Sequence, residues 1–190
     1  MKLVNTKAKI VGAKDLSPTA RELQIVPEIP IDFIPGMFVN IFMEDKGVTI
    51  RRAYSVSSDP RQRDSFTISA RLLKNGGMSP LFWRDDILNK EIKVMGPMGF
   101  NTSNKLGENK IFLFAFGIGV SVIKSIASEM IANPEVKELF IVTGNTNEDE
   151  ILYKDFLDNL WKNNEKVTVQ YVLSKPKNLN YPYTGHIQDF

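Results

Sequence analysis

The sequence predicts an α+β protein of two parts, a six-stranded antiparallel β-barrel followed by a short α/β part with a parallel sheet. Three observations support this prediction. Residues 1–100 alternate apolar and polar side chains between turn residues, as half-buried strands do. Residues 101–110 are polar and contain few apolar side chains. Beyond them, continuous apolar runs alternate with helical patterns, which is typical of a buried parallel sheet.

Six segments of the first hundred residues have the strand pattern. The clearest is residues 65–73, in which Phe66, Ile68 and Ala70 fall on one face of a strand. Turn pairs such as Pro35-Gly36 separate the segments. Six strands with short antiparallel connections favour a small closed barrel, which has no free sheet edges. The expected strands are residues 8–16, 20–26, 37–43, 48–57, 65–73 and 91–95.

One helix is expected within the barrel part. Ser79 has the side chain of a good N-cap, Pro80 suits the first helical position, and residues 81–88 follow.

The second part alternates strands and helices. Residues 111–116, 139–144 and 167–174 are expected as strands, and residues 120–131 and 151–162 as helices. Asn147 is expected to cap the second helix, with Glu148, Asp149 and Glu150 in its first turn. This alternation predicts a parallel, Rossmann-like sheet with right-handed crossovers.

Composition excludes several kinds of protein. The 190 residues carry a net charge of +2, so a dominant nucleic-acid or membrane-surface role is not favoured. The chain has no cysteine and one histidine, so we expect no disulfide, iron–sulfur cluster or other metal site. No apolar run approaches the ~20 residues of a membrane span, and no leader pattern is visible. We therefore expect a cytoplasmic protein.

The segment Arg51–Ser58 contains the first candidate site. On a strand, Arg52 and Tyr54 point to the same face. A guanidinium and a phenol ring side by side suit a ligand that has both a phosphate and a flat ring system. The alternative, which the local pattern leaves open, is an edge strand with a solvated arginine and a half-buried tyrosine.

Two glycine-containing segments are further candidates. Gly76, Gly77, Met78 and Ser79 precede the expected helix, where free backbone N–H groups and a hydroxyl favour an anion. An ordinary turn before a capped helix would have the same sequence. The segment 116–120 ends a buried strand and opens a helix, which is where Rossmann-like folds bind dinucleotides.

The order of these motifs resembles the ferredoxin–NADP reductase family of flavoprotein reductases. R-x-Y-S is followed by G-x-x-S, by G-P-x-G-x-F at residues 96–100, and by strand-G-x-G-helix. The resemblance runs from residue 35 to residue 187, and its most specific motif is R-x-Y-S-x-x-S at Arg52–Ser58. Electron-transfer subunits of dihydroorotate dehydrogenase are a nearby branch, but their iron–sulfur cysteines are absent here.

The resemblance implies a role for each matching residue. Tyr54 would stack on the isoalloxazine of FAD, Arg52 would pair with its pyrophosphate, and Ser55 would be the catalytic residue near N5, where hydride arrives. The implied FAD-binding set is Arg52, Tyr54, Ser55, Ser58, Gly76, Gly77, Met78 and Ser79, and the implied nicotinamide dinucleotide contacts are Gly117 and Gly119.

We therefore expect an FAD-binding β-barrel domain at residues 1–101 and an NAD(P)-binding-like α/β domain at 110–190. The second is truncated, because family members continue past residue 190 with another helix and strand. NADH is preferred to NADPH, since Thr146 stands where many members carry an arginine.

The expected function is a flavin-dependent oxidoreductase that passes a hydride between NAD(P)H and FAD, and electrons to an unidentified protein or small-molecule acceptor. One alternative is an FAD-binding electron-transfer subunit without its own nicotinamide site, completed by a partner protein. The other is a cofactor-free interaction module.

Overall fold

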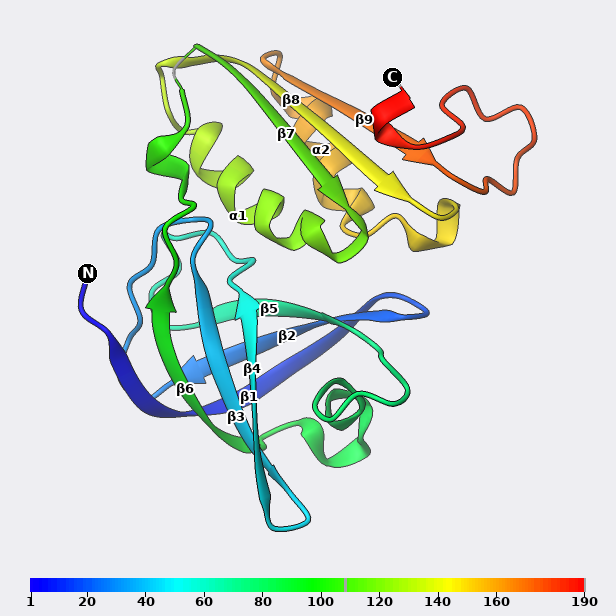
Figure 1. Ribbon diagram of the computed structural model, residues 1–190. Coiled ribbons are helices and arrows are strands. Elements are labelled where there is room, and N and C mark those ends of the chain that lie inside the picture. Colours follow the sequence, from blue (N-terminus) through cyan, green and yellow to red (C-terminus); the bar gives the residue numbers. More distant parts are fainter. Residues whose placement is uncertain (108, 190) are drawn as a thin grey trace.

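The protein contains two β-sheets, one above the other in Figure 1. The structure is a computed structural model that describes residues 1–107 and 109–189. The lower sheet has six antiparallel strands and the upper sheet has three parallel strands. The two kinds of sheet and their order along the chain confirm the predicted fold class.

The first sheet curls into a half-barrel. Its strand order is β4-β3-β6-β1-β2-β5, so β4 and β5 are the edges. A bridge between Val56 and Ile68, and a 2.8 Å hydrogen bond from the Ser57 N–H to the Thr67 carbonyl, join the two edges just beyond β4. The barrel is therefore closed only along a short seam. Its strands are β1 (Val4–Ser17), β2 (Ala20–Pro27), β3 (Phe38–Asp45), β4 (Val48–Ser55), β5 (Phe66–Arg71) and β6 (Glu91–Met98).

The apolar positions of these strands face the inside of the half-barrel. Phe66, Ile68 and Ala70 are buried, as their alternation predicts. Phe82 is fully buried among them. Burying one large apolar side chain contributes about 1.5–3 kcal/mol, so this interior supplies much of the sheet's stability.

The prediction of one continuous helix after Ser79 is wrong. Two 3-10 helices, η1 (Ser79–Trp83) and η2 (Asp85–Ile87), occupy this segment, and Ser79 does not cap either of them. Arg84 between them is extended, with ψ of 150°. Arg21 donates a 3.0 Å hydrogen bond to the Phe82 carbonyl, which an α-helix would need for itself. Local sequence patterns could not predict this contact with β2.

The second sheet has the order β7-β8-β9, with β7 (Asn109–Phe116), β8 (Val136–Asn145) and β9 (Val167–Leu173) all parallel. Its two α-helices are α1 (Val120–Met130) and α2 (Lys154–Asn163). Three 3-10 helices lie in the connections: η3 (Ser103–Lys105), η4 (Gly117–Gly119) and η5 (Glu148–Glu150). A further one, η6 (Ile187–Asp189), follows β9.

The second α-helix begins later than expected. Tyr153 has a left-handed φ of 56°, so α2 starts at Lys154 rather than near residue 151. Asn147 does act as a cap, but it accepts its hydrogen bond from the Asp149 N–H and so caps η5 instead of α2.

Both α-helices cover the same face of the parallel sheet. The strands β7, β8 and β9 lie side by side in the order of the chain. Right-handed crossovers between them therefore place α1 and α2 on the same side of the sheet. Ile111, Leu113 and Ala115 of β7 are buried on that side. Figure 1 shows α1 between the parallel sheet and the half-barrel, so its N-terminal end reaches the contact between the two sheets.

The linker from β6 to β7 packs closely against the turn before β3. Gly36 has a φ of 101°, and a Cβ built on it would lie 2.1 Å from the Asn101 carbonyl oxygen. Glycine is required here both for its conformation and for the close approach of the linker.

Gly36→Ala should therefore lower the free energy of unfolding by about 2–4 kcal/mol, because strain and a backbone clash add. Gly47→Ala is the matched control: Gly47 has a φ of 78° but nothing within 4 Å of its built Cβ. It should cost only about 1–2 kcal/mol. Urea unfolding measures both variants, and equal losses would contradict a special role for the linker contact.

Candidate active site

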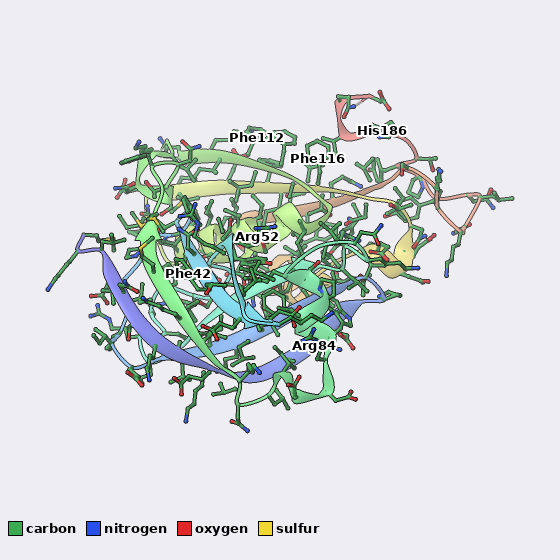
Figure 2. The ribbon with its side chains drawn as sticks, turned by 60° about the horizontal axis from the view of Figure 1, so that its bottom comes forward. Phe42, Arg52, Arg84, Phe112, Phe116 and His186 are labelled. Carbon is green, nitrogen blue, oxygen red and sulfur yellow. The ribbon has the colours of Figure 1, made fainter. Side chains whose placement is uncertain are left out.

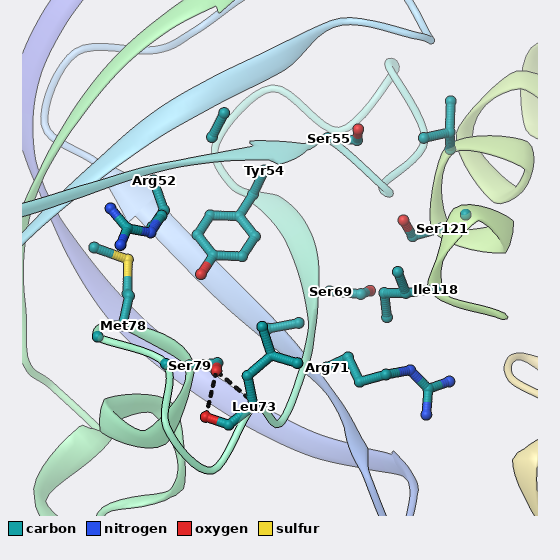
Figure 3. Close-up of a pocket in the computed structure, with 16 residues that line it drawn as sticks. Arg52, Tyr54, Ser55, Ser69, Arg71, Leu73, Met78, Ser79, Ile118 and Ser121 are labelled. Carbon is teal, nitrogen blue, oxygen red and sulfur yellow. Dashed lines mark hydrogen bonds between the residues drawn. The ribbon is translucent and has the colours of Figure 1, made fainter.

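A cleft of about 620 Å³ lies where the half-barrel meets the second sheet. One wall comes from β4, β5 and residues 73–79, and the other from η4 and the start of α1 (Figure 3). The cleft brings together eight of the ten site residues expected from the sequence: Arg52, Tyr54, Ser55, Gly76, Gly77, Met78, Ser79 and Gly119.

Tyr54 presents a flat ring to this cleft. Its ring packs edge-on against Phe82, with centroids 5.5 Å apart and planes at 62°. Burial raises the pKa of Tyr54 to about 12, although the nearby Arg52 acts in the opposite direction. At neutral pH the phenol is therefore protonated, and its ring face and O–H group are both available to a ligand.

Arg52 places a cation beside the glycine segment. One of its terminal nitrogens donates a 2.7 Å hydrogen bond to the Arg51 carbonyl. The other terminal nitrogen lies 3.7 Å from the position of a Cβ on Gly77. In the described part of the chain the other guanidinium N–H groups have no further partner, so they can bind an anion in the cleft.

The glycine segment is a tight turn that leads directly into η1. Ser79 Oγ accepts a 3.0 Å hydrogen bond from the Leu73 N–H and closes the turn. A Cβ on Gly76 would lie 3.0 Å from the Leu73 carbonyl and 3.1 Å from Ser79 Oγ. The helix that follows is η1, a 3-10 helix of five residues, and the Ser79 hydroxyl serves the turn instead of capping that helix, so the expected anion site in this segment stays a prediction. What remains is backbone beside Arg52, with Met78 buried behind it.

The opposite wall contains a residue that the sequence analysis missed. Ser121 is only 5 % exposed, and in the described residues its hydroxyl has no hydrogen-bond partner. Figure 3 shows it pointing toward the cleft, across from Ser55. Its place two residues after Gly119, in the first turn of α1, was a signal that could have identified it. Ile118 and Val122 make the rest of this wall apolar.

Two expected site residues lie outside the cleft. Ser58 Oγ accepts a 3.2 Å hydrogen bond from the Thr67 N–H, and the Ser58 carbonyl accepts a 2.7 Å bond from Ser125 Oγ of α1. Ser58 thus joins the half-barrel to α1. Gly117 lines a second cavity instead.

The second cavity, of about 400 Å³, lies at the carboxyl ends of the three parallel strands. Ligands of open α/β sheets bind at this end. Phe116, Gly117 and Asn145 line it together with Thr146 and His186. His186, the only histidine, is exposed there, and its backbone N–H donates to Asp189.

Arg71 lines both cavities and was also missed by the sequence analysis. Its guanidinium donates to Glu150, 2.9 Å away, and to the Thr19 hydroxyl. Glu150 also accepts bonds from Ser17 (3.1 Å) and Thr19 (2.9 Å). Burial opposes ionisation of Glu150, but these hydrogen bonds outweigh it and lower the pKa of that carboxyl. Arg71 is thereby fixed between the cavities.

A second polar cluster crosses the same contact. Lys124 of α1 lies 2.7 Å from the Glu22 carboxylate, and the Tyr153 hydroxyl donates a 2.6 Å hydrogen bond to the same carboxylate. Tyr153 also contacts the Ser69 hydroxyl. Burial raises the pKa of Tyr153 above its ordinary value, and the negative charge of Glu22 adds to this. The two clusters hold both walls of the cleft in place.

A curled antiparallel sheet, a parallel sheet with helices, and a cleft between them define the fold of ferredoxin reductase-like flavoproteins. Residues 7–102 match the oxidoreductase FAD-binding domain family, and residues 113–190 match the oxidoreductase NAD-binding domain family. The chain belongs to this family of FAD/NAD-binding oxidoreductases.

Curated relatives and solved structures agree with this assignment. Ferredoxin–NADP reductase B of Sorangium cellulosum is 25% identical over 171 residues, which are 89% of this chain and 70% of that protein. NADH-cytochrome b5 reductase 1 of Dictyostelium discoideum is 30% identical over 143 residues, 74% of this chain and 49% of that protein. The cytochrome P450 reductase GcoB of Amycolatopsis has the same fold, with a TM-score of 0.87 at 16% identity over 99% of this chain. The chain spans only 57% of GcoB.

Residues 1–107 and 109–189 contain neither a candidate membrane-spanning helix nor a candidate cluster of metal ligands. No helix there is long and apolar enough to cross a membrane. No group of three or more histidine, cysteine, aspartate or glutamate side chains could hold a metal ion in that part of the chain. The cytoplasmic location stays a prediction.

Glu150→Gln should lower the free energy of unfolding at pH 7 by about 1–3 kcal/mol, because Arg71 loses a charged partner. Since the folded state holds the pKa of Glu150 below its ordinary 4.5, this contribution is complete above that value and is lost as the pH falls through the lowered pKa. The difference between wild type and variant should therefore shrink in acid.

Urea unfolding from pH 7 down to pH 3 measures this difference. Glu135→Gln is the control, because Glu135 is exposed and its carboxylate has no partner in the described residues. A pH-independent difference between wild type and Glu150→Gln would contradict an ionised contact with Arg71.

Proposed function

We propose that this chain binds FAD in the cleft and transfers electrons from NAD(P)H, through the flavin, to a separate acceptor. The observation that carries the proposal is the convergence of Arg52, Tyr54 and Gly77, from two distant segments, on one cleft in a chain of the FAD-binding family. When bound, FAD would supply the redox chemistry, accepting a hydride and giving up electrons.

The residues of the cleft fit FAD. A volume of about 620 Å³ lies within the ~300–1,000 Å³ usual for cofactor sites. Tyr54 offers a neutral ring for stacking against the isoalloxazine, and Arg52 beside the Gly76–Gly77 backbone offers charge and N–H groups to a pyrophosphate. FMN, which has a single phosphate, would use less of this set.

The two walls of the cleft are proposed to contribute different contacts to the flavin ring. Ser55 on the half-barrel wall is proposed to touch the flavin near N5, and Ser121 offers a second hydroxyl from α1. Both can orient a ring by hydrogen bonding. Ile118 and Val122 line the same space with apolar side chains and would keep water away from a bound flavin ring.

The second cavity is proposed to hold part of the nicotinamide dinucleotide. Gly117 allows a close approach at the end of β7, and Arg71, which lines both cavities, supplies positive charge for a pyrophosphate. NADH is favoured over NADPH because the neutral Thr146 lines this cavity where an arginine would pair with a 2′-phosphate.

The acceptor is proposed to be another redox protein. Several relatives are described as reductase components or subunits of monooxygenases. The names of those proteins thus include the enzyme of which each is a part. A second candidate function is an FAD-binding subunit whose nicotinamide site is completed by a partner, and the bulky Phe116 side chain that lines the second cavity beside Gly117 favours it.

Titration of the apoprotein with FAD tests the first proposal. The wild type should quench flavin fluorescence and shift its absorbance. Arg52→Ala should weaken FAD binding by about 1–3 kcal/mol, or roughly 5- to 150-fold in Kd, since a charge-assisted contact is lost. Tyr54→Ala should weaken it through lost stacking.

Arg51→Ala is the matched control, because Arg51 is the neighbouring cation on β4 but does not line the cleft. It should bind FAD like the wild type. Equal weakening in Arg51→Ala and Arg52→Ala, or no flavin binding by the wild type, would contradict the assignment.

Anaerobic mixing of the FAD-loaded protein with NADH or NADPH separates the two candidate functions. Rapid bleaching of the flavin, faster with NADH, is expected if the chain carries its own nicotinamide site. Bound flavin that neither nucleotide reduces would instead favour the subunit completed by a partner.

A further inference from the structure

A chain of hydrogen bonds runs from the cleft to the carboxylate of Glu22. Ser69 of β5 lines the cleft (Figure 3) and is only 6 % exposed. Its hydroxyl is hydrogen-bonded to the hydroxyl of Tyr153, which donates a 2.6 Å hydrogen bond to the Glu22 carboxylate. Tyr153 is also buried, whereas the side chain of Glu22 is 16 % exposed. The chain therefore links the cleft to solvent through two buried hydroxyl groups.

These hydrogen bonds all point away from the cleft. Glu22 is ionised in its salt bridge with Lys124, and an ionised carboxylate can only accept hydrogen bonds. The Tyr153 hydroxyl therefore gives its one proton to Glu22, and its oxygen accepts a hydrogen bond from Ser69. Within the described residues Ser69 Oγ then accepts no hydrogen bond itself, so its lone pairs can accept a proton from the cleft.

The other side chains of the cleft offer no comparable route in the described part of the chain. The cleft has no histidine, aspartate or glutamate in its lining, and His186, the one histidine of the chain, lines the second cavity. Figure 2 shows His186 well away from Arg52 of the cleft. The other hydroxyls of the cleft either have no partner in the described residues or close the turn at residues 73–79: Tyr54, Ser55, Ser121 and Ser79.

The backbone at Tyr153 holds its hydroxyl in this chain. Its left-handed φ of 56° is uncommon for a bulky residue, and strained backbone of this kind is concentrated at functional sites. Ser57 also lies near the Tyr153 hydroxyl, but it is fully buried and its own hydroxyl pairs with that of Thr67, 2.8 Å away. Ser69 is therefore the link between Tyr153 and the cleft.

The proposed reaction releases a proton in the cleft. The nicotinamide is oxidised according to NAD(P)H → NAD(P)⁺ + H⁺ + 2 e⁻, and an acceptor that takes single electrons receives the electrons without the proton. That proton has to leave the cleft in each turnover. Ile118 and Val122 line the cleft with apolar side chains, so the proton needs a polar route past them.

We propose that Ser69, Tyr153 and Glu22 relay this proton from the cleft to solvent. The inference rests on the proposed function. Ser69 Oγ accepts the proton and passes its own to Tyr153, the proton of Tyr153 moves to Glu22, and the Glu22 carboxyl releases a proton to water. Each hydroxyl oxygen gains one O–H bond and loses one, so its charge is the same before and after the transfer. Ser69 faces the cleft, and Tyr153 and Glu22 are positioning residues that act through it.

Proton release during electron delivery tests the proposal. The FAD-loaded protein is reduced by light, without any nicotinamide nucleotide, and is mixed with ferricyanide in weak buffer that contains a pH indicator dye. Tyr153→Phe and Ser69→Ala should release the proton roughly tenfold more slowly than the wild type, because a positioned proton acceptor is lost. Ser69→Thr keeps the hydroxyl and should restore the rate.

Tyr171→Phe is the matched control. Tyr171 is also a buried tyrosine whose hydroxyl donates a 2.6 Å hydrogen bond to a carboxylate, that of Asp158, but it does not line the cleft. Both variants lose one hydrogen bond from a phenol to a carboxylate, so a purely structural role predicts the same effect in both. Tyr171→Phe should release the proton like the wild type, and Tyr153→Phe should keep the wild-type Kd for FAD.

The outcomes separate the relay from the proposed function. A wild type that takes up no FAD would contradict the proposed function and the relay with it. If FAD binds and ferricyanide oxidises it, equal rates of proton release in the wild type, Tyr153→Phe and Ser69→Ala would overturn the relay alone. Equal slowing in Tyr153→Phe and Tyr171→Phe, or a Ser69→Thr variant as slow as Ser69→Ala, would overturn it as well.

Discussion

The contact between the two sheets is the constraint on which both cavities depend. Each wall of the cleft belongs to a different sheet, so the cleft keeps its shape only while the sheets keep their relative position. Two partly buried ionic clusters fix that position. Glu150 links the turn between β1 and β2 to Arg71 of β5, and Glu22 of β2 links to Lys124 of α1. Charged groups in such places are costly without good partners, and here every carboxylate has several.

Each sheet contributes a different kind of chemistry to the cleft. The half-barrel provides the cation and the neutral aromatic ring, and its rigid strand β4 fixes the spacing of Arg52 and Tyr54. The parallel sheet provides an apolar wall and the hydroxyl of Ser121 at the start of α1. Neither set alone encloses a cofactor. The proposed flavin site therefore exists only where the two sheets meet. Substitutions at Glu150, although this residue is far from Tyr54 in the sequence, are expected to change the shape of that site.

Local periodicity predicted the sheets well but predicted the site only in part. Alternation at Phe66, Ile68 and Ala70 follows from burial on one face, and the structure confirms it. The apolar run at 111–116 forms the expected parallel strand, but only Ile111, Leu113 and Ala115 are buried, so the expected burial of the whole run is wrong. The helix after Ser79 failed because distant groups, Leu73 and Arg21, take the hydrogen bonds on which it would depend. Arg71 was missed for a similar reason, since its importance comes from the second sheet, which no pattern within β5 reveals.

A crystal structure of the chain grown with FAD tests the central claim most directly. The account predicts the isoalloxazine between Tyr54 and the wall formed by Ile118 and Ser121, with the pyrophosphate against Arg52 and the backbone of Gly77. A flavin bound elsewhere on the molecule, or a cleft in which Arg52 contacts only its own polypeptide while FAD is absent, would contradict it.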